Sequence, residues 1–304
     1  MRIFKSIDES LPFFKALSSG VRIQILNVIA KEPGMNLNEL ASRIGITSGA
    51  LTAHIRTLED AGIIETKTIA ASRHGVQKIC MVITEKYLTQ IGFDDTEQDF
   101  YNTELRPGHY INYHVLPTCG LATAQQIVGV YDDPVYFADV KRFNAQILWF
   151  AAGFVEYDIP NHLPEGSICK RLMIQAELGS EAVAFNNDYK SDIHFSINGQ
   201  HIGVWQSPGD FGGVKGFCNP DWWPPRMNQY GTLLELRIDN RGTFAEGRQI
   251  SDMNLTKLGI VPKNRIRWRL SVPENMSNSR GLTIYGRGFG NYDSGIMVSL
   301  NYEQ

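Results

Sequence analysis

Polar and cationic side chains gather between residues 47 and 78, and their types suit contacts to phosphate groups and base edges. Arginine, lysine and histidine bring N–H donors to phosphate oxygens, and serine and threonine hydroxyls hydrogen-bond to phosphates or bases. The sequence therefore predicts a surface that binds double-stranded DNA. The predicted contact residues are Thr47, Ser48, Thr52, His54, Arg56, Lys67, Arg73, His74 and Lys78.

These residues need a scaffold, and the sequence around them predicts two short helices joined by a tight turn. Asn36 is a candidate N-cap with Glu39 three residues later, which is the spacing of a capping box. Gly45 can end this helix because glycine accepts the left-handed backbone of a C-cap, and Thr47 can cap the next helix. Apolar residues recur at helical spacing in both segments, at Leu37, Leu40, Ala41 and Ile44, and then at Leu51, Ile55, Leu58 and Gly62.

The neighbouring segments distinguish a DNA-binding unit from an ordinary helical hairpin. Residues 16–30 carry an apolar stripe and predict a helix upstream, and residues 63–84 predict two strands joined by a polar, Gly-containing turn. Three helices followed by a ribbon describe a winged helix-turn-helix, which lays one helix in the DNA major groove. Cations at the ribbon tip would meet phosphates or the adjacent minor groove. The alternative is a solvated hairpin tip.

The segment from about Phe13 to Tyr87 resembles the ArsR-type winged-helix transcriptional regulators. The residues that carry the resemblance are Leu17, Arg22, Ile25, Leu26, Leu40, Ala41, His54, Ile55, Leu58 and Ala61-Gly62-Ile63-Ile64. The resemblance covers a little over a quarter of the chain. It implies a repressor, a homodimer, and a DNA contact for His54, which could instead be a buried packing residue. It also makes Phe4, Leu11 and Phe14 candidate interface residues, with a core role as the alternative.

Metal chemistry is not expected. Metal-sensing ArsR-type proteins place cysteines in the helix before the turn, whereas residues 36–43 contain none. The cysteines of this chain are far apart and form no CxxC pattern; they are Cys80, Cys119, Cys169 and Cys218. We therefore expect reduced structural thiols, no metal site and no cofactor.

Length and charge predict two domains. The chain has 304 residues, of which 43% are hydrophobic and 20% charged, as in ordinary globular proteins. Up to residue 90, eleven Lys/Arg stand against eight Asp/Glu, a net of +3; the remainder has eighteen against twenty-four, a net of −6. A mildly basic first domain fits contact with phosphates. After a short predicted helix that starts at Thr84 the chain becomes acidic, and we place the domains at residues 1–92 and 93–304.

No segment predicts insertion into a membrane. The N-terminus contains Lys5, Asp8 and Glu9 and lacks an apolar signal core. The longest apolar run, residues 145–155, is too short for a bilayer, which needs about 20 residues, and it predicts a buried strand. We therefore expect a cytoplasmic protein without a membrane partner.

The second domain reads as a succession of short strands with Gly and Pro turns. Asn198-Gly199, between two such strands, is a strong hairpin signal. Residues 286–295 contain GxGxG without a following helix, which predicts a close-packed β corner rather than a phosphate loop. Many short strands without alternating helices predict an antiparallel β-sandwich or jelly roll and argue against Rossmann and TIM architectures. The expected fold class is α+β multidomain, a winged helix-turn-helix followed by this β domain.

The densest group of aromatic and polar residues lies between Trp205 and Gly231. Flat indole faces beside amide and charged groups suit a small ligand with apolar faces and polar edges, such as a sugar. The predicted effector-binding residues are Trp205, Asp210, Lys215, Asp221, Trp222, Trp223 and Arg226. The alternative is that the aromatic residues only anchor a long loop over the sandwich.

The function that these patterns predict is a homodimeric, DNA-binding transcriptional regulator controlled by a small effector bound to the second domain. Two recognition helices would enter successive major grooves about 34 Å apart, so the operator should be near-palindromic. No spacing singles out catalytic residues, and neither GxSxG nor HExxH is present, so we do not expect an enzyme. Two alternatives remain for the second domain, a carbohydrate-active enzyme and a pure dimerisation or protein-interaction module.

Overall fold

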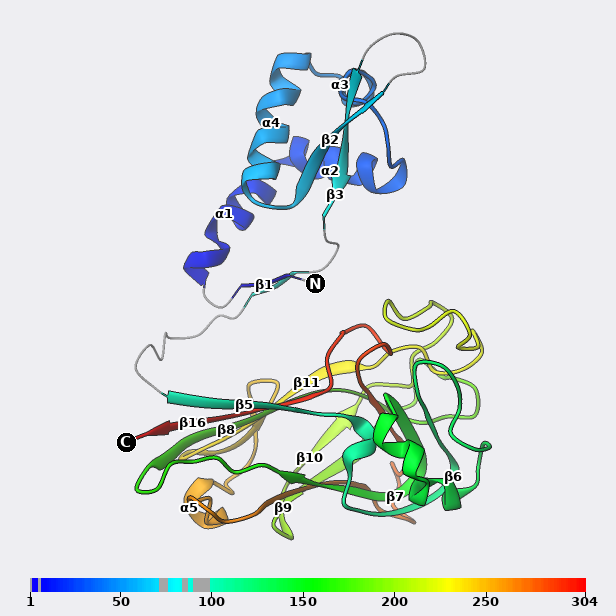
Figure 1. Cartoon of the computed structure of the whole chain (residues 1–304), viewed down its shortest axis with the longest axis vertical. Helices are drawn as coiled ribbons and strands as arrows, with labels where there is room; N and C mark the ends of the chain where they lie inside the picture. Colours follow the sequence, from blue (N-terminus) through cyan, green and yellow to red (C-terminus); the bar gives the residue numbers. More distant parts are fainter. Residues whose placement is uncertain (1, 5–6, 71–75, 84–86, 90–98) are drawn as a thin grey trace. The chain divides into compact units, whose positions relative to one another are not determined.

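The structure is a computed structural model that describes residues 2–4, 7–70, 76–83, 87–89 and 99–304. The chain forms two compact units, Met1–Thr96 and Glu97–Gln304 (Figure 1). Each unit has its own hydrophobic core. The predicted boundary between residues 92 and 93 lies outside the described residues.

The first unit has the predicted order of helices and ribbon. Its helices are α1 (Ile7–Leu17), α2 (Gly20–Lys31), α3 (Leu37–Ile44) and α4 (Ser48–Asp60), and its antiparallel ribbon is β2 (Ile64–Ala70) with β3 (Val76–Val82). The apolar stripes of the helices meet in one core that includes Ile25, Ile29, Leu40, Leu51, Ile55 and Leu58. Burying each such side chain contributes about 1.5–3 kcal/mol, so the stripes hold the helices together.

The segment after the ribbon differs from the prediction of a short helix from Thr84. Residues 87–89 form strand β4 (Tyr87–Thr89), which pairs in parallel with β1 (Arg2–Phe4). The Tyr87 ring lies 4.3 Å from the Phe13 ring and 6.2 Å from the Phe4 ring, between ring centroids. Packing among these aromatic rings outweighs local helix propensity, which is only a weak preference.

Residues 99–304 form an antiparallel β domain, which confirms the predicted α+β multidomain fold class. Its strands are β5 (Asp99–Leu105), β6 (Asn112–Ala122), β7 (Ile147–Ile159), β8 (Ile168–Gly179), β9 (Ser191–Ile197), β10 (Gln200–Ser207), β11 (Thr232–Asp239), β12 (Gly242–Ala245), β13 (Arg248–Ser251), β14 (Ile266–Val272), β15 (Leu282–Tyr285) and β16 (Ile296–Glu303). Short helices lie between them: η1 (Pro107–His109), η2 (Pro134–Ala138), η3 (Val140–Asn144) and α5 (Leu255–Leu258). The predicted buried strand at residues 145–155 corresponds to β7.

The sheet bends over its own core. The strands follow the order β10-β9-β14-β7-β15-β8-β11-β12-β13, with β16 paired to β8 and β5, and β6 paired to β7. Figure 1 shows β5, β16, β8 and β11 in one layer and β7, β9 and β10 in another. The short strand β15 pairs with both β7 and β8 and so joins the two layers. Alternate residues of β9 and β14 are buried in the core, as the two-residue period of a strand requires.

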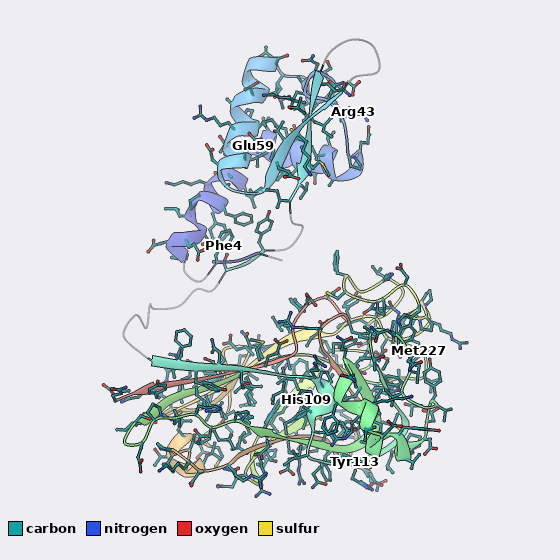
Figure 2. The ribbon with its side chains drawn as sticks, viewed as in Figure 1. Phe4, Arg43, Glu59, His109, Tyr113 and Met227 are labelled. Atoms are coloured by element: carbon teal, nitrogen blue, oxygen red, sulfur yellow. The ribbon has the colours of Figure 1, made fainter. Side chains whose placement is uncertain are left out.

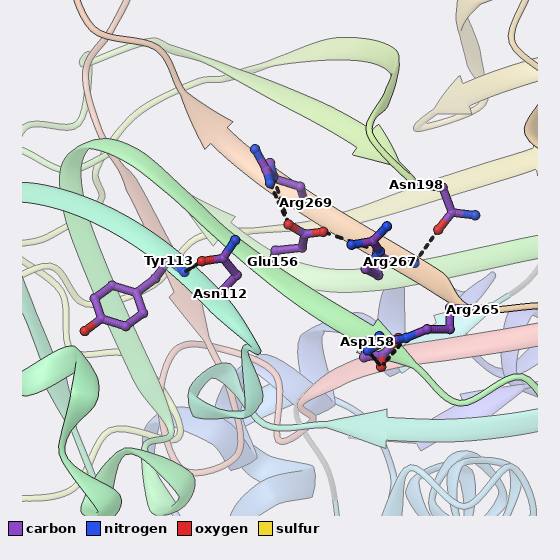
Figure 3. Close-up of polar contacts among 8 residues, drawn as sticks. All are labelled: Asn112, Tyr113, Glu156, Asp158, Asn198, Arg265, Arg267 and Arg269. Carbon is purple, nitrogen blue, oxygen red and sulfur yellow. Dashed lines mark hydrogen bonds and ion pairs between the residues drawn. The ribbon is translucent and has the colours of Figure 1, made fainter.

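A polar ladder crosses from β7 to β14 (Figure 3). Glu156 is almost fully buried, and its carboxylate accepts a hydrogen bond of 2.6 Å from Nη2 of Arg269. Asp158 pairs with Arg265 at the end of the ladder. The backbone N–H of Arg267 donates to Oδ1 of Asn198 at 2.9 Å, which ties the predicted β9–β10 hairpin to β14. Asn198 and Gly199 both have positive φ, 50° and 79°, as a tight hairpin turn requires.

The glycine-rich segment at residues 286–295 forms the predicted close-packed corner. It wraps around the buried carboxylate of Glu177, which accepts hydrogen bonds of 2.9–3.0 Å from the backbone N–H groups of Gly231, Asn291 and Tyr292. A Cβ at Gly290 would lie 2.3 Å from Oε2 of Glu177, so only glycine allows this approach.

Candidate nucleic-acid interface

Hydrogen bonds at the start of α3 fix where the helix begins. The backbone N–H groups of Asn38 and Glu39 donate to Oδ1 of Asn36 at 3.0 Å each. The carboxylate of Glu39 accepts in return from the backbone N–H of Asn36 at 3.4 Å. These contacts complete the predicted capping box and satisfy N–H groups that a helix start otherwise leaves without partners.

The turn between α3 and α4 is equally well defined. Gly45 adopts a φ of 80°, and its N–H donates to the carbonyl oxygen of Ala41 at 2.9 Å, which closes α3. The hydroxyl of Thr47 accepts a hydrogen bond of 3.2 Å from the backbone N–H of Ala50 and caps α4. The caps fix the limits of the turn, and α3 and α4 pack against each other in the same core through Leu40 and Leu51.

The predicted contact residues on α4 divide by exposure. Thr47, Ser48, Thr52 and Arg56 are exposed, whereas His54 is half-buried. The Arg56 side chain is 83% exposed, and its Nε lies 4.0 Å from Oδ2 of Asp60, a separation at which the pair leaves the guanidinium available to a phosphate. Gly49, Ala50 and Ala53 are also exposed. Because their side chains are small, the first turns of α4 can approach base edges closely.

The ribbon β2–β3 corresponds to the wing. Figure 1 shows it running beside α4. Lys67 and Lys78 are both exposed, and Lys67 pairs with Glu65 at 2.7 Å. Lys78 lies opposite Thr68 and Lys67 lies opposite Ile79, so the two ammonium groups project from opposite faces of the ribbon. Arg73 and His74 lie outside the described residues.

Helix α1 exposes apolar side chains, whereas Phe4 in the preceding strand is buried. Leu11 and Phe14 are 46% and 45% exposed. Phe4 is 1% exposed and packs against Phe13, so Phe4 is a core residue of this unit rather than an exposed interface residue. Leu11 and Phe14 remain candidate interface residues.

Burial keeps the thiols of Cys80, Cys119 and Cys169 in their protonated form. Burial raises the pKa of Cys119 to about 12 and that of Cys169 to about 11. It also raises the pKa of Cys80, against a hydrogen bond with Thr66 that lowers it. Metal ligation and nucleophilic attack both need the thiolate, so these three sites suit a structural role.

The predicted effector residues do not converge on one surface. Trp205, Asp210 and Trp223 are buried, Trp222 is half-buried, and the remaining three are exposed: Lys215, Asp221 and Arg226. Lys215 and Asp221 form an ion pair of 2.7 Å with each other. Clefts of about 260 to 620 Å³ lie elsewhere in the described part of the β domain, and the four best formed are lined by none of these seven residues.

The two adjacent tryptophans anchor the loop that carries them. The indole N–H of Trp222 donates to the carbonyl oxygen of Ala124 at 2.6 Å, and that of Trp223 donates to the carbonyl oxygen of Asn228 at 2.8 Å. The Trp223 ring packs edge-on against Phe289 and Trp149, with centroid distances of 5.1 and 5.9 Å. This packing matches the alternative in which the aromatic residues fasten a long loop, and the effector assignment stays a prediction.

Two buried acids lie beneath that loop. Glu181 accepts hydrogen bonds from the hydroxyl groups of Thr118 and Thr283, at 3.0 and 3.3 Å, and from the Asn228 amide. Burial, reinforced by the nearby Asp210 charge, raises the pKa of Glu181 well above its ordinary value. Burial also raises the pKa of Asp210 to about 7. Sequence analysis singled out Asp210 but not Glu181, because the partners of Glu181 are spread over more than 150 positions.

Comparison with known proteins relates the first unit to winged helix-turn-helix proteins. Residues 19–65 match a family described as winged helix-turn-helix DNA-binding. The chain is 36% identical over 55 residues to an uncharacterized HTH-type transcriptional regulator of Methanocaldococcus jannaschii, a match that covers 18% of this chain. The chain spans 57% of that relative's length.

Two solved structures show partial likeness. One is a fragment of a possible transcriptional regulatory protein from Mycobacterium bovis, with 23% identity over 26% of this chain and 77% of that one, and a TM-score of 0.22. The other is the cellulose induced protein Cip1, with 11% identity over 70% of this chain and 91% of that one, and a TM-score of 0.18. The family match and the geometry of α3, α4 and the ribbon together identify the first unit as a winged helix-turn-helix DNA-binding domain. No helix in the described residues is long and apolar enough to cross a membrane.

Proposed function

We propose that this protein is a DNA-binding transcriptional regulator. The observation that carries the proposal is the outer face of α4, which is exposed, polar and held by capped helices on both sides of the turn. Such a face fits the major groove, where side chains read base edges. The exposed Lys78 can contact a phosphate, and Lys67 can exchange its surface pair with Glu65 for one. The printed description of the Methanocaldococcus relative as an HTH-type transcriptional regulator supports the same function.

The proposed working form is a homodimeric repressor of the ArsR type. The exposed Leu11 and Phe14 on α1 offer an apolar surface that a second copy of the chain would cover. A two-fold dimer places two α4 helices in successive major grooves about 34 Å apart, and it therefore favours a near-palindromic operator.

For the β domain we propose a non-enzymatic role as the sensor of a small effector, with a sugar or sugar derivative as the first candidate. The effector would bind the DNA-competent and DNA-incompetent forms of the dimer with different affinity, which is what regulation requires. Clefts of about 520 and 620 Å³ in this domain are large enough for such a molecule, which supports this assignment.

Selection from a pool of random duplexes tests the DNA-binding part. The full chain should enrich a near-palindromic sequence whose half-sites are one helical turn apart, at a stoichiometry of two chains per duplex. Thr52→Ala and Arg56→Ala should change the preferred bases, since each removes one exposed group from the α4 face. The matched control is Arg248→Ala, which removes an exposed cation from the β domain and should leave the enriched sequence unchanged.

A double change at α1 tests the dimer. Leu11→Glu with Phe14→Glu places charges in the proposed interface and should give a monomer in sedimentation experiments, with operator affinity reduced at least tenfold. A wild-type chain that is monomeric when bound to its operator would contradict the homodimer. If the selection enriches no sequence, the proposed function as a DNA-binding transcriptional regulator is contradicted.

A further inference from the structure

Two clefts in the β domain share part of their lining. The larger has a volume of about 620 Å³ and the smaller about 520 Å³, and both are lined by Arg106, Asn144 and Gln146. The larger continues to Phe143 and Arg287, and the smaller continues to Lys141. We call the two clefts together the Arg106 groove. The volume of each cleft is in the range of sites for small molecules.

The walls of the groove are fixed before any ligand arrives. The guanidinium of Arg142 donates to the carbonyl oxygens of Gly108 and Tyr110, at 2.8 and 2.6 Å, and so fastens η3 to the segment that follows β5. The backbone of Gln146 pairs on both sides, with the carbonyl oxygen of Ala122 and the N–H of Gly286. A rigid frame of this kind loses little conformational entropy on binding, which favours affinity.

The groove concentrates positive charge on an otherwise acidic domain. Arg106, Lys141 and Arg287 line it, whereas the acid among its lining residues is Glu104, whose carboxylate is engaged by Arg287. Neither Arg106 nor Lys141 forms an ion pair with any residue that the structure describes, although Nη1 of Arg106 donates to Oδ1 of Asn144 at 3.3 Å. The charge of Arg106 also helps to lower the pKa of Glu104, but neither cation is held in an ion pair within the described residues, and both can contact an anionic ligand.

Other groups in the groove suit hydroxyls and an apolar face. Gln146 is half-buried and lines both clefts, and its amide can donate to or accept from a ligand hydroxyl. The side chain of Phe143 is 50% exposed, and its ring provides an apolar surface beside the cations. His109 borders the same cleft and is labelled in Figure 2.

We propose that the Arg106 groove binds a small polyhydroxylated anion of the sugar-acid or sugar-phosphate class. The carboxylate or phosphate contacts Arg106 and Lys141, a hydroxyl hydrogen-bonds to the Gln146 amide, and the carbon face of the sugar packs on Phe143. If the protein is the proposed regulator, this ligand is also the effector that changes its affinity for the operator.

Isothermal titration calorimetry on the full chain tests the binding site. The probes are D-glucuronate, D-glucose 6-phosphate and neutral D-glucose, at constant ionic strength. At least one anionic probe should bind saturably and much more tightly than D-glucose, and the two anions distinguish a carboxylate from a phosphate ligand. Arg106→Ala with Lys141→Ala should weaken that binding at least tenfold, because two charge-assisted contacts are lost.

The matched control is Arg248→Ala, which removes an exposed cation from strand β13. Arg106 and Lys141 are both exposed, so their double variant should keep the wild-type unfolding temperature, which is measured in parallel. Full affinity in the groove variant, or loss of affinity in Arg248→Ala alone, overturns the site. Equal binding of D-glucose and the anions, or no saturable binding of any probe at millimolar concentration, overturns it as well.

The effector role of the ligand is tested in a separate experiment. The probe that binds in calorimetry is added to the operator complex, and the affinity for DNA should change in the wild type but not in the groove variant. Unchanged operator affinity at saturating probe overturns the effector role and leaves the binding site standing. A chain that binds the probe but no specific duplex overturns the proposed function, and calorimetry still decides the groove.

Discussion

The guanidinium of Arg287 donates two hydrogen bonds to the carboxylate of Glu104, at 2.7 and 2.8 Å, across a separation of 183 residues. The pair joins the end of β5 to the glycine-rich corner after β15. The backbone N–H of Gly295 donates to the same carboxylate at 2.7 Å. The hydrogen bonds from Arg287 hold the pKa of Glu104 below its ordinary value, against partial burial, which raises it. The native state therefore binds this proton less tightly than the unfolded chain does.

Glu104→Gln should destabilise the β domain by about 1 kcal/mol at neutral pH, since a two-point ion pair is lost but solvent screens part of its strength. The contribution of Glu104 is present above its unfolded-state pKa of 4.5 and is lost as the pH falls through the lowered folded-state pKa. The difference in free energy of unfolding between wild type and variant should shrink accordingly in acid. Urea unfolding at a series of pH values measures it. Glu165→Gln, which removes an exposed pair with Lys263, is the control and should show no comparable difference.

Asn36→Ala should destabilise the first unit by about 1 kcal/mol, the usual effect of removing an N-cap side chain. Two backbone N–H groups at the start of α3 lose their acceptor in this variant. Thermal unfolding followed by the helical circular dichroism signal measures the change. Asn36→Asp retains a capping oxygen and should stay within a few tenths of a kcal/mol of the wild type. Equal losses in both variants would count against the capping box.

The parts of the fold that the sequence predicts are those that depend on residues only a few positions apart. The capping box of Asn36 and Glu39 and the left-handed Gly45 each depend on residues at most four apart. The Asn198-Gly199 turn depends on two adjacent residues that tolerate positive φ. Such features follow from local stereochemistry, and so the helix-turn-helix and the β hairpin were predictable.

The features that the sequence does not predict depend on distant partners. Strand β4 forms because Tyr87 packs on Phe4 and Phe13, which lie more than 70 positions earlier. The indole of Trp222 is fixed by a carbonyl oxygen 98 residues away, a contact that the neighbouring sequence does not reveal. The Arg106 groove likewise draws its residues from several separate segments and has no local motif.

Lys67→Ala with Lys78→Ala should weaken binding to all duplexes and lower the salt dependence of affinity. Each lysine that contacts a phosphate contributes about 0.9 to the slope of log affinity against log salt, so the slope should fall by up to about 1.8. The two ammonium groups lie on opposite faces of the ribbon, so each single variant should account for part of the effect. Fluorescence anisotropy at several salt concentrations measures it. An unchanged slope in the double variant would reject the ribbon as a phosphate contact.

Asp210 is a buried acid whose ionisation should affect the stability of the β domain. Its Oδ2 accepts a hydrogen bond of 3.0 Å from the backbone N–H of Ala182, whereas Oδ1 is buried and has no hydrogen-bond partner in the described residues. Burial raises its pKa from 3.8 to about 7. Glu181, Tyr285 and Glu177 are the titratable groups whose charges couple within this cluster.

A raised pKa in an acid means that the folded state binds the proton more tightly than the unfolded chain does. The contribution to stability is therefore complete below pH 3.8 and is lost as the pH rises toward 7 and above, by up to about 4 kcal/mol at roughly 1.4 kcal/mol per pH unit. Asp210→Asn keeps an acceptor for Ala182 and cannot ionise, so it should be more stable than the wild type above pH 7 and should lack this part of the pH dependence. Denaturant unfolding between pH 4 and 8 measures both quantities. Asp188→Asn, at an exposed position, should follow the wild type. If Asp210→Asn follows the wild type as well, the carboxyl is ionised in the folded domain without cost, and its burial does not control stability.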